Sequence, residues 1–142
     1  MAAMLRTFDQ IYSIELGREL WQKACDRFAG EPQVTLLHGD SASVLGELLP
    51  GVDRPCLFWL DGHYSAGVTA RSSRDTPIVA ELAHVAAHPF HRSDVILIDD
   101  ARLFTGAGDY PTMDWIRAWA LDEGYADMEI EDDVIVITPA MP

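Results

Sequence analysis

The chain has 142 residues and a formal net charge of −13, with 23 acidic side chains against 10 lysines and arginines. Because clustered Lys and Arg hold a phosphate backbone, this balance argues against a nucleic-acid partner. No apolar run approaches the roughly 18 residues that span a membrane, and the first six residues lack the apolar core of a secretory signal. We therefore predict one soluble, cytoplasmic domain over residues 1–142, without a membrane partner, for which homo-oligomer formation stays open.

The apolar pattern alternates between strand and helix along the chain. The expected elements begin with a strand at 8–15, a helix at 16–28, a strand at 34–37, a helix that Ser41 or Ser43 caps and Pro50 ends, and a strand at 57–60. After a polar loop at 62–76 come a helix that Thr76 caps and Pro77 begins, a strand at 95–98, a helix at 112–121, and a terminal hairpin around 131–133. Such alternation is typical of an α/β fold with a parallel sheet and helices on both faces.

Two of the apolar runs end abruptly in carboxylates. Asp61 follows the run at 57–60, and Asp99 and Asp100 follow the run at 95–98. In open α/β sheets the ligand lies outside the carboxyl ends of the strands, so we expect these three acids to meet there. Three carboxylates at one edge repel each other unless a metal ion or a basic group lies among them. The arginines considered for that role are Arg71, Arg74 and Arg102.

From strand 8–15 onward, the pattern resembles class I S-adenosylmethionine-dependent methyltransferases, and most closely the metal-dependent sugar O-methyltransferases of the macrocin type. The resemblance implies a Rossmann-like, mostly parallel sheet with a C-terminal antiparallel hairpin. In Ile14-Glu15-Leu16, Glu15 matches the acid that receives the ribose hydroxyls of the cofactor. In His38-Gly39-Asp40-Ser41, Asp40 and Ser41 match the turn beside the adenine amino group.

The two acid-ended strands carry the rest of the resemblance. Leu60-Asp61-Gly62 and Ile98-Asp99-Asp100 match the positions that bind magnesium in this subgroup, and Asp61 also faces the cofactor. A hard cation favours such oxygen ligands, and it can lower the pKa of an acceptor hydroxyl. His63 occupies the place of the family's proposed general base, so the resemblance implies a catalytic role for it. The implied acceptor is a small hydroxylated molecule; a sugar follows from the likeness alone.

The resemblance has a gap at its start. The family's first strand and Gly-rich turn have no counterpart before Phe8, and that strand would lie in the middle of the sheet, between strands 8–15 and 57–60. Backbone groups left unpaired on the two buried edges would each cost about 1–3 kcal/mol. We therefore expect an N-terminally truncated domain in which cofactor binding is weak or absent. Residues 68–76 are an insertion relative to the sugar enzymes.

Two alternatives from other classes stay open. Without its Gly-rich turn, a methyltransferase-like domain can be a degenerate, non-catalytic module for binding or oligomerisation. A serine hydrolase would use Ser65, but His63 replaces the first glycine of its G-x-S-x-G motif and no histidine follows His91.

The cysteines and the remaining histidines show no motif that indicates a function. Cys25 and Cys56 lack CxxC spacing, so both are expected to be reduced, partly buried thiols. The histidines around the end of the helix after Pro77 are expected at the surface, or with accidental metal affinity. They are His84, His88 and His91.

Overall fold

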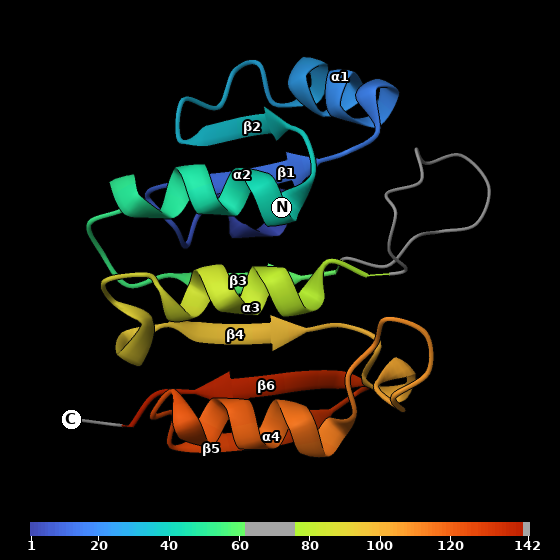
Figure 1. The fold of residues 1–142 in the computed structure, drawn as a ribbon. Helices are drawn as coiled ribbons and strands as arrows, with labels where there is room; N and C mark the ends of the chain where they lie inside the picture. Colours follow the sequence, from blue (N-terminus) through green and yellow to red (C-terminus); the bar gives the residue numbers. More distant parts are fainter. Residues whose placement is uncertain (62–75, 141–142) are drawn as a thin grey trace.

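Strands and helices alternate along the chain in the computed structural model, which describes residues 1–61 and 76–140 (Figure 1). The strands are β1 (Ile11–Glu15), β2 (Val34–His38), β3 (Leu57–Leu60), β4 (Val95–Ile98), β5 (Asp127–Glu131) and β6 (Val134–Thr138). The α-helices are α1 (Arg18–Arg27), α2 (Ser41–Leu48), α3 (Ile78–Ala86) and α4 (Met113–Asp122). Short 3-10 helices are η1 (Ala2–Met4), η2 (Leu49–Gly51), η3 (His91–Ser93) and η4 (Ala101–Leu103). The predicted α/β class and order of elements are confirmed.

Polar side chains bond to the first N–H groups of α2 and α3, but the capping residues differ by one position from the expected ones. The side chain of Asp40 accepts a hydrogen bond from the Ala42 N–H at 2.9 Å, so Asp40 caps α2 in place of a serine. The N-cap of α3 is Pro77, one residue after the predicted cap Thr76, whose hydroxyl accepts from the Ile78 N–H at 3.2 Å. A carboxylate one residue earlier reaches the same N–H groups as a serine hydroxyl, and local sequence does not separate the two.

The strands form two separate hydrogen-bonded sets. β1 and β2 pair in parallel, and the four-stranded sheet has the order β3-β4-β6-β5. Within it β3 and β4 are parallel, while β6 runs antiparallel to β4 and to β5. The expected mostly parallel sheet is therefore a mixed one. The tight turn at Asp132–Asp133, with φ of 48° and 67°, reverses the chain after β5 and lays β6 antiparallel beside β4.

Besides the outer edges of β2 and β5, two inner strand edges have no strand partner among the described residues. β1 pairs only with β2, and β3 pairs only with β4. These are the two strands between which the resemblance places the absent first strand. In Figure 1 they lie in the middle of the series of strands, between the β1–β2 pair and the four-stranded sheet.

The core lies on one face of the four-stranded sheet. Helices α3 and α4 both cover that face in Figure 1, where apolar side chains from neighbouring strands are buried. They include Phe58, Leu60, Ile96, Ile98, Ile135 and Ile137. Each such burial stabilises the fold by about 1.5–3 kcal/mol. On the opposite face of β3, Trp59 is 52% exposed and Leu57 40% exposed. The expectation of helices on both faces is therefore wrong for this sheet within the described residues.

Helices α2 and α3 pack against each other through a small residue. A Cβ added at Gly46 would lie 2.7 Å from Cε1 of His84, so a larger residue here would require the His84 ring to move. His84 is consequently half-buried rather than at the surface. This packing brings the start of α3 near the start of α2, at the same edge as the carboxyl ends of the strands.

Candidate functional site

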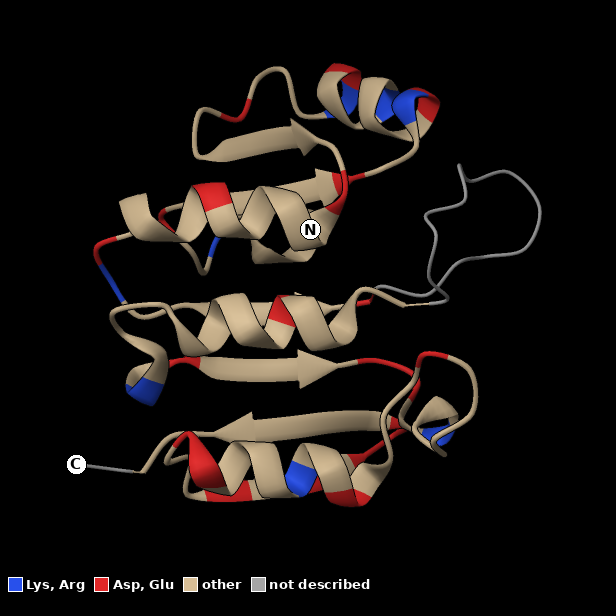
Figure 2. Cartoon of the chain, in the orientation of Figure 1, with Lys and Arg blue, Asp and Glu red and all other residues tan. Residues whose placement is uncertain are grey.

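A pocket lies at the carboxyl ends of β3 and β4. Its lining comprises Leu60, Asp61, Thr76, Ile78, Ile98, Asp99, Asp100, Phe104 and Tyr110. The three aspartates expected to meet at this edge thus line one pocket. Figure 2 shows acidic segments at the carboxyl ends of several strands, so this edge carries much of the negative charge of the chain.

The parallel pairing of β3 and β4 places these acids next to each other. Leu60 pairs with Ile98, and the Asp99 N–H donates to the Leu60 carbonyl at 3.0 Å, so both strands end at the same level. Asp100 then adopts the left-handed conformation, with φ of 58° and ψ of 49°. Its N–H donates to Oδ1 of Asp99 at 2.8 Å, which orients the Asp99 carboxylate.

An arginine supplies a positive charge at this edge. Nη2 of Arg102 lies 2.5 Å from Oδ1 of Asp100, and the same guanidinium forms an ion pair with Asp133 from the β5–β6 turn. The Arg102 N–H also donates to Oδ1 of Asp133 at 2.9 Å. The sequence left open whether a metal ion or a basic group balances the three carboxylates. A basic group, Arg102, is present at Asp100. Asp61 and Asp99 are the other two carboxylates of the pocket.

The aspartates share a pocket without forming a tight ligand set. Among the described residues, one group of three ligating side chains brings its ligand atoms within 4.8 Å of one another, and it consists of Cys56, His88 and Asp94. These residues precede β3 and β4, at the opposite ends of the strands from the pocket. A divalent ion at the aspartates would therefore depend on water molecules for part of its coordination, as Mg²⁺ commonly does.

Two further acids predicted to bind the cofactor lie at the carboxyl ends of β1 and β2. Glu15 ends β1 and accepts a hydrogen bond from the Gly17 N–H at 2.7 Å through Oε1. Asp40 follows β2 and uses Oδ1 for the cap of α2. Neither residue lines the pocket between β3 and β4. The structure thus brings three of the predicted site residues together and leaves Glu15 and Asp40 at the ends of the separate β1–β2 pair.

Glu81 is a polar residue of this edge that the sequence analysis did not single out. It is 3% exposed, and its Oε2 has no hydrogen-bond partner among the described residues. Burial raises the pKa of this carboxyl, a hydrogen bond from Ser41 lowers it, and the charge of Asp40 raises it. In the sequence, Glu81 could have been noticed as an acid between Ile78 and Leu82, within the apolar stripe of α3.

Two further sequence expectations concern residues placed differently or not described. For His88 the sequence predicts a surface position or accidental metal affinity. The surface position is wrong, because His88 is 1% exposed and its ring packs against Phe58 and Phe90, whereas its side chain does belong to the group of possible ligands with Cys56 and Asp94. The predicted base His63 lies outside the described residues, as do Ser65, Arg71 and Arg74.

Comparison with models of protein families, with curated proteins and with solved structures finds no match. Within the described residues, no helix has the length and apolar character to span a membrane.

Proposed function

We propose that this chain is a methyltransferase-like domain that uses S-adenosylmethionine to methylate a hydroxyl of a small acceptor. The observation that carries the proposal is that Asp61, Asp99 and Asp100 line one pocket at the ends of two neighbouring parallel strands. A crevice outside the carboxyl ends of the strands is the ligand position of open α/β sheets. The strand order supports a Rossmann-like fold with one interior strand position between β1 and β3 unfilled by described residues.

The cofactor would lie along the ends of β1, β2 and β3. Glu15 would accept the ribose hydroxyls, and Asp40 and Ser41 would face the adenine. The hydrogen bonds from Gly17 and Ala42 use one oxygen of each carboxylate and hold the side chain in place. A carboxylate can accept further donors through its second oxygen, which suits a cis-diol or an amino group.

A divalent ion, Mg²⁺ for example, would bind at Asp61 and Asp99, with Asp100 held by Arg102 beside it. When bound, such an ion orients an acceptor diol and lowers the pKa of its hydroxyl. Asp99 is prepared for this role because the Asp100 N–H fixes one of its oxygens. The base that takes the hydroxyl proton would be His63.

Titration calorimetry with S-adenosylmethionine and with its demethylated product, with and without Mg²⁺, tests the proposal. We expect saturable binding that Asp61→Asn weakens by roughly 10–100-fold, as the loss of a charged hydrogen-bonding group does. Asp53→Asn is the matched control, because Asp53 has an 81% exposed side chain and lies before β3. A folded sample that gives no heat of binding with either compound would overturn the proposal.

One observation favours the alternative of a non-catalytic module for binding or oligomerisation. Trp59 and Leu57 present exposed apolar surface on the face of β3 opposite α3. If this face is an interface, sedimentation will show self-association that Trp59→Ser abolishes, and calorimetry will show no cofactor binding. Cofactor binding by a Trp59→Ser monomer would favour the enzyme.

A further inference from the structure

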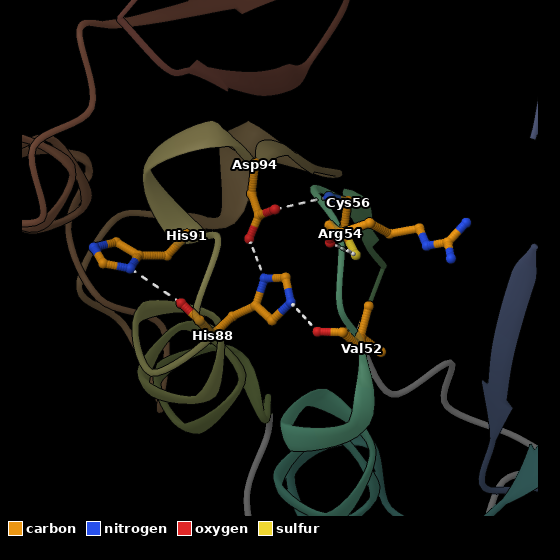
Figure 3. A network of polar contacts seen from close by, with 6 residues as sticks. All are labelled: Val52, Arg54, Cys56, His88, His91 and Asp94. Carbon is orange, nitrogen blue, oxygen red and sulfur yellow. Dashed lines mark hydrogen bonds and ion pairs between the residues drawn. The ribbon is translucent and has the colours of Figure 1, made fainter.

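A second polar cluster lies at the ends of β3 and β4 away from the pocket (Figure 3). Cys56 precedes β3, His88 follows α3, and Asp94 precedes β4, so three separate segments meet. Their ligand atoms lie within 4.8 Å of one another, and the side chains of His88 and Asp94 are fully buried. Five residue steps along β3 separate Cys56 of the cluster from Asp61 of the pocket, a distance of about 16.5 Å at about 3.3 Å per residue.

Both ring nitrogens of His88 have a polar partner. Its Nε2 is 3.3 Å from the Val52 carbonyl, which can only accept, so Nε2 carries a proton. Its Nδ1 is 2.7 Å from Oδ2 of Asp94, a carboxylate that also accepts when ionised. Two electron pairs cannot face each other at this distance. Either a shared proton, as in a hydrogen bond, or a metal ion therefore lies between Nδ1 and Oδ2.

The surroundings of the two side chains match those of metal ligands. A histidine that binds metal through one nitrogen usually donates from the other to a carbonyl or carboxylate, as His88 does to Val52. A ligating carboxylate is itself held by hydrogen bonds, and Oδ1 of Asp94 accepts from the Cys56 N–H at 2.7 Å. The side chains of His88 and Asp94 are thus each oriented by a hydrogen bond made through the atom that does not face the ligand cluster.

The thiol of Cys56 decides which kind of metal fits. Its sulfur lies 3.5 Å from the Arg54 carbonyl and is half-buried, so one side of the cluster is accessible. A set of sulfur, imidazole nitrogen and carboxylate oxygen suits Zn²⁺, whereas Mg²⁺ requires oxygen ligands. Burial and the charge of Asp94 raise the pKa of the Cys56 thiol to about 11, so an incoming ion has to displace the thiol proton.

We propose that Sγ of Cys56, Nδ1 of His88 and Oδ2 of Asp94 form a zinc-type metal site that joins the start of β3 to the α3–β4 connection. Binding releases the proton between Nδ1 and Oδ2 and the thiol proton. The Nδ1–Oδ2 separation then opens from 2.7 Å to about 3.3 Å, as two ligands at about 2.0 Å from a tetrahedral ion require. The site is independent of the methyltransferase proposal, because it uses none of the pocket residues.

Co²⁺ titration of the full chain under reducing conditions tests this site, since thiolate-bound Co²⁺ absorbs by charge transfer in the near ultraviolet. We expect a band that saturates at one ion per chain and that Zn²⁺ abolishes. Cys56→Ser should lose the band. Cys25→Ser is the matched control and should keep it, because Cys25 lies on α1 and outside the cluster. Asp99→Asn should also keep the band.

The absence of a charge-transfer band from folded wild-type protein would overturn the proposal, as would a band that persists in Cys56→Ser. A second measurement covers the case in which Cys56→Ser does not fold. Alkylation of each cysteine in wild-type protein is followed by peptide mass analysis, and Zn²⁺ should slow the reaction of Cys56 but not that of Cys25. Equal rates for Cys56 with and without Zn²⁺ would contradict the site.

Discussion

Asp94→Ala is expected to cost about 3–5 kcal/mol of unfolding free energy in metal-free protein. The Asp94 carboxylate accepts from the Cys56 N–H and from His88 at 2.7 Å each, and it is fully buried. Its removal leaves two buried donors without a partner, each worth about 1–3 kcal/mol. The side chains of His88 and Asp94 are both fully buried, and breaking a buried pair of this kind typically costs about 3–5 kcal/mol. These estimates agree, because they describe the same lost contacts.

Urea denaturation followed by circular dichroism, with a chelator present, measures this cost. Asp53→Ala is the control, since the Asp53–Arg54 pair is largely exposed and should change the free energy by less than about 0.5 kcal/mol. The unfolding free energy of Asp94→Asn should lie between those of Asp94→Ala and Asp53→Ala, because the amide oxygen can still accept from the Cys56 N–H. A loss below about 1 kcal/mol in Asp94→Ala would refute the claim that the contacts of Asp94 with Cys56 and His88 stabilise the fold.

Three other outcomes follow from the strand-end residues. Asp99→Asn should weaken Mn²⁺ binding in paramagnetic resonance titrations, and unchanged affinity would remove Asp99 as a ligand; exposed Asp109→Asn is the control. Asp40→Ala should lower the unfolding free energy by about 0.5–2 kcal/mol through loss of the α2 cap, and an unchanged thermal midpoint would contradict this. Because burial raises the pKa of Glu81, the folded chain holds this proton more tightly than the unfolded chain. Its stability relative to Glu81→Gln should therefore decrease as the pH rises from 4.5 to neutral. A difference in urea stability between these two proteins that does not vary with pH would disprove this.

The order of elements and the meeting of three aspartates were predictable because both depend on local pattern. Apolar runs such as 57–60 and 95–98 mark buried strands wherever they occur, and parallel neighbours bring their carboxyl ends to one edge. The mixed sheet was harder to predict, because the placement of β6 beside β4 depends on tertiary packing. The exposure of Trp59 likewise depends on which face of the sheet each helix covers, and the apolar pattern of a helix does not predict that face.

The partners of individual polar side chains were not predictable from the sequence. Arg102 was one of three arginines considered, and its choice of Asp100 depends on the docking of the β5–β6 turn. His88 looks like a surface histidine in the sequence, because its partners Val52 and Asp94 come from other segments. Each of these contacts follows from the folded topology rather than from sequence spacing.

Amide chemical-shift mapping by NMR, as S-adenosylmethionine and Mg²⁺ are added, tests the central claim most directly. That claim is that ligands bind at the carboxyl ends of β1 to β4. We predict shifts concentrated at residues that follow these strands, including Glu15, Asp40, Asp61 and Asp99, with little change at Cys56 and Asp94. Shifts confined to the opposite ends of the strands, or no shifts in a folded sample, would contradict the account.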